Sequence, residues 1–121
     1  MKYSSTRGGN QKHPIDFVDA VLTGLADDGG LMVPIEIPQV DDDMLSKWQN
    51  LQYSDLAFEI MRLFIDRGSI CDSDLNQMVS SAYGSQWSTV EICPTIHLSH
   101  ETAQNPNLYI LELFHGPTFA F

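Results

Sequence analysis

The sequence predicts a chain of the α/β class that is mainly helical up to about residue 84 and ends in a β-strand. Apolar residues recur at helical spacing in four segments between residues 16 and 84. Residues 108–114 instead form an apolar run of strand-like length and composition. With 43% hydrophobic and 18% charged residues, the 121-residue chain has the composition of a folded domain that buries roughly two-thirds of its unfolded surface.

The first 34 residues predict a helix between two short extended segments. Residues 2–6 read as a short edge strand. Asp16 and Asp19 have the spacing of a capping box and place acid at the positive end of a helix. The Asp-Asp-Gly-Gly sequence at residues 27–30 is a strong turn signal, so we expect residues 31–34 to be extended. The helix carries one apolar stripe, made of Val18, Val21, Leu22 and Leu25.

Three further helices are expected before residue 85. Asp41–Asp43 place three acids at the start of a short helix. Ser54 can cap the next helix, and Asp72 can cap a last one that closes at Gly84. The helix after Ser54 is apolar nearly all round, so we expect it to be the most buried; its apolar residues are Leu56, Ala57, Phe58, Ile60, Met61, Leu63, Phe64 and Ile65.

The end of the chain reads as a buried strand running into a sharp turn. The irregular stretch 85–107 contains a possible strand over 95–98, and the apolar run 108–114 follows. Gly116 permits a tight backbone turn, and Pro117 fixes φ and removes a donor. Thr118 can cap a following helix, whose free backbone N–H groups would face a ligand. A strand, a tight turn and a helix start are a common way to build a ligand site.

Charge and composition exclude several classes of partner. The formal net charge is −10 and the six basic residues are scattered, so we expect neither nucleic acid nor an anionic membrane as a partner. No apolar run approaches the ~18 residues of a membrane span, and no signal sequence follows Met1. Cys71 and Cys93 suggest neither a disulfide framework nor a metal knuckle. A reduced, cytoplasmic protein fits these features best.

Three motifs occur in order along the chain. Residues 111–121 read Leu-Glu-Leu-Phe-His-Gly-Pro-Thr-Phe-Ala-Phe, residues 3–8 read Tyr-Ser-Ser-Thr-Arg-Gly, and residues 24–34 read Gly-Leu-Ala-Asp-Asp-Gly-Gly-Leu-Met-Val-Pro. Two shorter segments, Tyr-Ser-Asp-Leu-Ala at 53–57 and Ala-Tyr at 82–83, lie between these motifs. In this pattern the chain resembles threonine synthases, which use pyridoxal phosphate (PLP), and the resemblance covers its whole length.

The resemblance implies a division of the chain and an activity. Residues 1–93 would be a small, mainly helical N-terminal domain, and residues 94–121 would be the first strands of a fold type II PLP-enzyme body. The family activity is that of a lyase, converting O-phosphohomoserine and water to L-threonine and phosphate. This reaction is the last step of threonine biosynthesis.

The resemblance also assigns cofactor residues. It places the Schiff-base lysine immediately after Phe121, so we expect no catalytic residue within residues 1–121 and no activity from this segment alone. Two explanations for the end of the sequence at Phe121 remain open: the polypeptide was cut there, or the sequence breaks at a lysine modified by PLP. His115, Thr118 and Phe121 are the expected cofactor contacts. His115 has an equally plain alternative as a turn histidine bonded to a backbone carbonyl.

Substrate and metal ligands have weaker signals. Ser5, Thr6 and Arg7 offer two hydroxyls and a guanidinium fork suited to a substrate phosphate, although an N-terminal arginine is usually a surface charge. The histidines and acid in His97-Leu-Ser-His-Glu101 lack a second ligand pair, so a solvated loop is favoured over a metal site. Asp41–Asp43 lack the spaced acids and glycine of a calcium loop.

Two alternative functions remain open at this stage. A threonine synthase-like phospho-lyase acting on O-phosphothreonine would carry nearly the same N-terminal motifs. A non-catalytic interaction module is the third hypothesis. We expect the strand at 108–114 to be an unpaired apolar edge in such a module, and the isolated chain to self-associate or to be only marginally stable.

Overall fold

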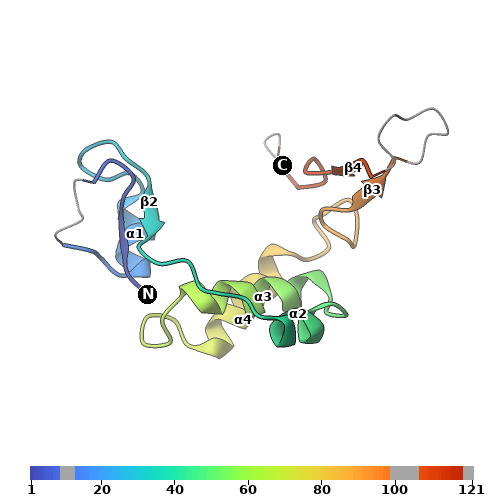
Figure 1. Ribbon diagram of the computed structural model, residues 1–121, viewed down its shortest axis with the longest axis horizontal. Coiled ribbons are helices and arrows are strands. Elements are labelled where there is room, and N and C mark those ends of the chain that lie inside the picture. Colours follow the sequence, from blue (N-terminus) through green and yellow to red (C-terminus); the bar gives the residue numbers. More distant parts are fainter. Residues whose placement is uncertain (9–12, 99–106, 119–121) are drawn as a thin grey trace.

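The computed structural model describes residues 1–8, 13–98 and 107–118, which form an elongated chain (Figure 1). A strand–helix–strand unit lies at one end, three helices lie in the middle, and a small hairpin lies at the other end. Within the described residues the fold is thus of the α/β kind, with four helices and two small sheets. The elements are β1 (Tyr3–Ser5), α1 (Phe17–Thr23), β2 (Met32–Pro34), α2 (Asp42–Trp48), α3 (Tyr53–Phe64), α4 (Asp72–Ala82), β3 (Thr95–His97) and β4 (Tyr109–Leu111).

The first sheet confirms the extended segments predicted around the first helix. β1 and β2 pair antiparallel, with Tyr3 opposite Pro34 and Ser5 opposite Met32. The Asp-Asp-Gly-Gly sequence forms the predicted turn, and Gly29 has φ +76°, a conformation that glycine adopts without strain. This pairing brings the motif at residues 3–8 beside the motif at residues 24–34.

The expectations for α1 were wrong in two details. Asp16 is the N-cap residue, but its side chain makes no capping hydrogen bond and pairs with Lys2 Nζ at 2.8 Å instead. The two-stranded sheet covers a different face of the helix, on which Ala20 is buried and Phe17 lies 5.8 Å from the ring of Tyr3. The apolar stripe therefore points largely outward, and its members Val21, Leu22 and Leu25 are exposed.

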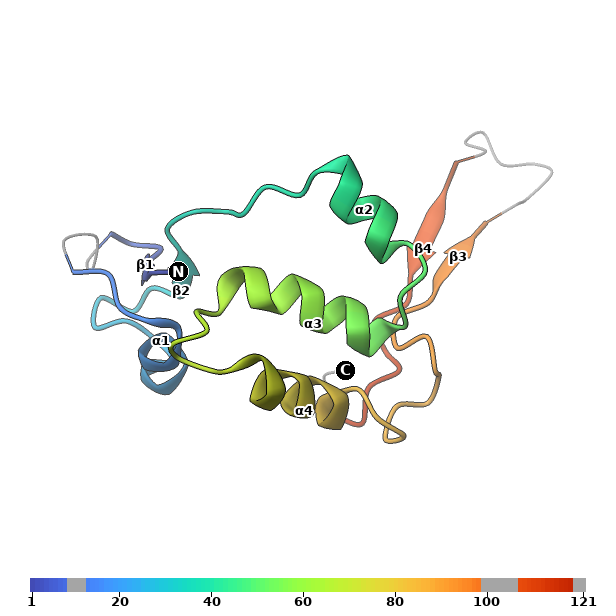
Figure 2. The same cartoon turned by 90° about the horizontal axis from the view of Figure 1, so that it is seen from below.

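The middle of the molecule is built on the pairing of α3 with α4. Their shared core contains Ile65, Leu75 and Val79, which are at most 5% exposed. α3 was expected to be the most buried helix, but none of its side chains is fully buried, because only one of its sides packs on α4. α2 lies beside α3 (Figure 2), and side chains of both helices line a groove between them.

The helix ends show which capping predictions hold. Asp41 caps α2 by accepting a hydrogen bond from the backbone N–H of Met44 at 2.8 Å. Ser54 is not a cap, because α3 begins one residue earlier and Gln52 is its N-cap residue. Asp72 is the first residue of α4, where its carboxylate pairs with Arg67 rather than capping the helix.

The terminal strand is present but is not buried as predicted. β3 and β4 pair antiparallel, with Thr95 opposite Leu111 and His97 opposite Tyr109. Every residue of both strands is exposed. The hairpin projects from the helical middle, and no described element covers its faces (Figure 1). No helix in the described part of the chain is long and apolar enough to cross a membrane.

Candidate functional site

The turn that follows β4 is attached to the loop that follows α4. The hydroxyl of Ser88 lies 3.0 Å from Nδ1 of His115, and Nε2 of His115 lies 2.7 Å from a carboxylate oxygen of Glu112. Two backbone hydrogen bonds reinforce this attachment: Ser88 N–H donates to the His115 carbonyl at 3.1 Å, and Glu112 N–H donates to the Pro94 carbonyl at 2.9 Å. The start of the turn is thereby fixed to the helical part of the molecule.

A cavity of about 460 Å³ lies beside this turn. Pro117 and Thr118 form part of its wall, so the predicted ligand turn borders this partly open cavity. Its volume is within the range of small-molecule sites, which are mostly apolar with a few polar groups. The remaining lining residues are aromatic, aliphatic or thiol-bearing: Tyr53, Tyr83, Trp87, Ile92, Cys93 and Leu113.

The aromatic wall is ordered by ring contacts. The rings of Tyr53 and Tyr83 meet edge to face at 4.9 Å, and Trp87 lies 5.8 Å from Tyr83. Burial raises the pKa of Tyr53 to about 12, and a hydrogen bond with Cys93 adds to the rise. Burial therefore favours the neutral form of the Tyr53 hydroxyl.

The second predicted site, Ser5 to Arg7, is held by the turn between α1 and β2. The hydroxyl of Ser5 donates to the Asp28 carboxylate at 2.7 Å, and the Gly30 N–H donates to the same oxygen at 2.9 Å. Thr6 accepts from the Leu31 N–H at 3.1 Å. Arg7 Nη1 donates to the Asp28 carbonyl at 2.9 Å. These partners give all three residues a structural role in joining the two motifs.

The structure brings together some of the predicted residues and separates others. His115 and Thr118 lie in one turn, and Thr118 lines the cavity. Phe121 lies outside the described residues, as do two members of the histidine-rich segment, His100 and Glu101. The Ser5–Arg7 segment belongs to the opposite end of the molecule from the β3–β4 hairpin (Figures 1 and 2).

Sequence reasoning did not find the partners of the turn. Glu112 had a signal, because it lies three residues before His115 and interrupts an apolar strand run. Ser88 had none, because it lies 27 residues from His115 in an irregular segment. The aromatic wall was also missed, since its rings come from α3, from the end of α4 and from the loop that follows.

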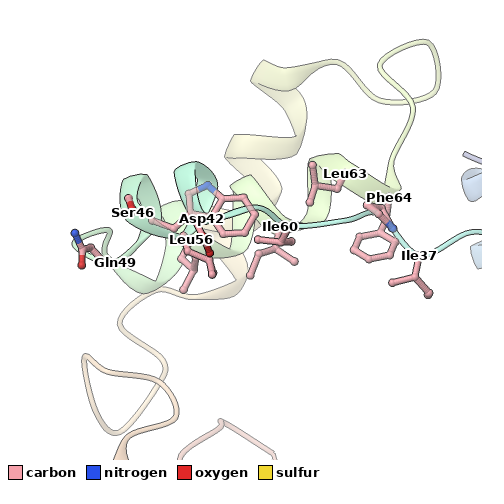
Figure 3. Close-up of a pocket in the computed structure, with 12 residues that line it drawn as sticks. Ile37, Asp42, Ser46, Gln49, Leu56, Ile60, Leu63 and Phe64 are labelled. Atoms are coloured by element: carbon pink, nitrogen blue, oxygen red, sulfur yellow. The ribbon is translucent and has the colours of Figure 1, made fainter.

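A larger groove, of about 900 Å³, lies between α2, α3 and the segment that precedes α2. Ile60, Leu63 and Phe64 of α3 point into it along with Ile37, while Ser46 and Gln49 lie at one end (Figure 3). Its walls are mostly apolar and carry no convergent polar groups, so we place the candidate site at the turn and not here. Among the described residues, no group of His, Cys, Asp or Glu side chains is arranged to hold a metal ion.

The fold and site define an α/β chain in which a strand and a tight turn are attached to a small helical region beside a cavity. The family model described as the threonine synthase N terminus matches residues 2–83. The chain belongs to this family.

Relatives and solved structures agree with this assignment. The chain is 46% identical to the threonine synthase of Saccharomyces cerevisiae, over 98% of the chain and 23% of that protein. It is 37% identical to threonine synthase-like 2 of Homo sapiens, over the whole chain and 23% of that protein. The crystal structure of yeast threonine synthase superposes with a TM-score of 0.81 at 44% identity, covering 96% of the chain and 22% of that structure. PLP-bound threonine synthase from Brucella melitensis gives 0.78 at 37% identity, covering 97% of the chain and 23% of that structure. The chain therefore spans less than a quarter of the length of these relatives.

Proposed function

We propose that this chain is the N-terminal part of a threonine synthase, which converts O-phosphohomoserine and water to L-threonine and phosphate with PLP as cofactor. The observation that carries the proposal is the strand and turn at residues 109–118, which has the family's sequence and is fixed to the helical region through His115. Family membership and 46% identity to a protein named threonine synthase support it.

The residues at the turn fit a planar, anionic cofactor. The aromatic wall of the neighbouring cavity suits a flat ring, and the Thr118 hydroxyl is a polar group at its edge. When bound, PLP supplies an electron sink for the carbon skeleton of an amino-acid substrate. We propose that it is attached to a lysine immediately after Phe121 and that His115, Thr118 and Phe121 surround it. PLP bound to the solved Brucella relative supports PLP as the cofactor.

The division of the chain follows from the same proposal. Residues 1–93 form the helical N-terminal domain, and residues 94–121 begin a fold type II body in a cytoplasmic enzyme. The exposed strand β4 supports this division, because its apolar side chains suit the inside of a larger sheet.

For Ser5, Thr6 and Arg7 we propose a role toward the substrate phosphate, with Arg7 as the contacting member. Ser5 is 3% exposed and donates to Asp28, so it orients the segment. Arg7 is exposed and bonds to Asp28 through Nη1, and among the contacts of the described residues the guanidinium keeps other donors for an anion.

Turnover by the longer protein that contains this chain tests the activity. We expect threonine and phosphate from O-phosphohomoserine at a higher kcat/KM than any product from O-phosphothreonine. Arg7→Gln should raise KM for O-phosphohomoserine, whereas Arg62→Gln, a change at an exposed arginine of α3, should not. Borohydride reduction and peptide mapping should find PLP on the residue after Phe121. Absence of threonine formation would reject the proposal.

A second candidate is a phospho-lyase acting on O-phosphothreonine. The match to threonine synthase-like 2 at 37% identity favours it, although less strongly than 46% identity favours threonine synthase. Preferential turnover of O-phosphothreonine in the same assay would select this alternative.

A further inference from the structure

Both ring nitrogens of His115 are occupied by side chains that lie on either side of it in the fold. Nδ1 lies 3.0 Å from the Ser88 hydroxyl, and Nε2 lies 2.7 Å from Glu112 Oε2. The side chains of His115 and Glu112 are 19% and 26% exposed, so water competes only partly for these bonds. The ring of Phe114 lies 4.6 Å from the imidazole and shields it further.

The chemistry of the two partners determines which ring nitrogen of His115 carries the hydrogen. An ionised carboxylate only accepts hydrogen bonds, so the Nε2 atom facing Glu112 carries a hydrogen. In the neutral ring Nδ1 is then an acceptor, and the Ser88 hydroxyl donates to it. The arrangement selects one tautomer and one ring orientation, and neither nitrogen is left for a ligand.

The hydrogen bonds that connect Ser88, His115 and Glu112 also join two parts of the molecule. Ser88 belongs to the loop that follows α4, whereas Glu112 and His115 lie between β4 and the turn. The imidazole comes directly before Gly116, so its orientation sets where the turn begins. Backbone hydrogen bonds at Ser88 and Glu112 hold the same two segments together.

We propose that Ser88 and Glu112 are positioning residues that lock His115 in its Nε2–H tautomer and thereby fix the turn over residues 116–118. His115 then acts as a fixed support of the turn and does not exchange a proton with a ligand bound there. The identity of that ligand rests on the proposed function, but the locked imidazole does not.

Serine, histidine and a carboxylate also form the catalytic triad of many hydrolases. Here, however, the serine makes further contacts with the backbone of the histidine. The Ser88 hydroxyl lies 3.3 Å from the His115 carbonyl, to which the Ser88 N–H also donates. The hydroxyl has a single hydrogen, which the shorter 3.0 Å contact directs to Nδ1, so the longer contact with the carbonyl adds little. Positioning of the turn is the role that these contacts support.

Nitrogen-15 spectroscopy of the longer protein that contains this chain, labelled at histidine and free of cofactor and substrate, tests the proposal at about pH 9, where histidine is ordinarily neutral. In the unmodified chain we expect His115 almost wholly in the Nε2–H form. Glu112→Leu should lower the ratio of the Nε2–H tautomer to the Nδ1–H tautomer roughly tenfold, because a hydrogen bond to a charged acceptor is lost. Glu112→Gln, which keeps an accepting oxygen, should restore most of it. Ser88→Ala should shift the Nδ1 resonance, whereas Ser88→Thr and the control Ser85→Ala should not.

A mixture of tautomers at His115 in the unmodified chain would overturn the proposal, whatever the variants do. So would an unchanged tautomer ratio in folded Glu112→Leu, or equal Nδ1 resonances in Ser88→Ala and the unmodified chain. These measurements use neither cofactor nor substrate. Failure here therefore leaves the proposed activity standing, and an inactive enzyme leaves this inference standing.

Discussion

Replacing Asp28 with alanine should destabilise the first sheet, because one carboxylate oxygen organises the turn between α1 and β2. That oxygen accepts hydrogen bonds from the Ser5 hydroxyl at 2.7 Å and from the Gly30 N–H at 2.9 Å. Ser5 is 3% exposed, so water does not readily replace the lost acceptor. A hydrogen bond to a charged group contributes about 1.5–3 kcal/mol, and Asp28 is itself partly exposed, so we expect a loss of about 2–4 kcal/mol.

Urea unfolding followed by circular dichroism measures this loss, and two variants separate its causes. Asp28→Asn keeps an accepting oxygen and should lose less than half as much as Asp28→Ala. Asp27→Ala changes the neighbouring exposed acid and should alter the free energy of unfolding by no more than about 0.5 kcal/mol. If Asp28→Ala and Asp27→Ala have equal effects, the carboxylate does not hold the turn and the reasoning fails.

Four further outcomes are expected. Gly30→Ala should cost about 1–3 kcal/mol in urea unfolding, because a Cβ at this position would collide with Ser5 Oγ; an unchanged midpoint would contradict the packing. Leu75→Ala should lower stability by about 2–5 kcal/mol, since Leu75 is 3% exposed, while Met78→Ala on the exposed side of α4 should have little effect. Burial raises the pKa of Tyr53 to about 12, so the folded chain holds this proton more tightly than the unfolded chain. The resulting stability is complete below about pH 10 and is lost as the pH rises toward 12, and Tyr53→Phe should flatten this part of the pH–stability curve. Light scattering should show that the 121-residue chain self-associates, whereas a monodisperse monomer with a cooperative melt would indicate an autonomous module.

Local features of the fold were predictable because their causes are local. The acids at 41–43 begin a helix because the Asp41 side chain reaches the Met44 N–H three residues on. The turn at 27–30 follows from two glycines, one of which adopts a positive φ. The bend at residues 116–118 likewise contains the glycine and proline that predicted it.

Burial was harder to predict, because an apolar pattern shows which face needs cover and not whether cover is present. Leu22 is in the expected stripe of α1 but is 80% exposed, since the two-stranded sheet lies against another face. α3 is apolar on two sides, and only the side facing α4 is filled. Ser88 was missed for a related reason, because its contact with His115 joins segments that no local pattern connects.

The exposure of β4 bears on the choice between an enzyme segment and an independent module. Tyr109, Ile110 and Leu111 are apolar at every position, which is the pattern of a strand buried on both faces, yet each is about half exposed. A strand selected for an autonomous hairpin would instead alternate polar and apolar side chains. The chain spans 23% of the length of its yeast relative. We therefore infer that β4 has the sequence of an interior strand of a larger sheet.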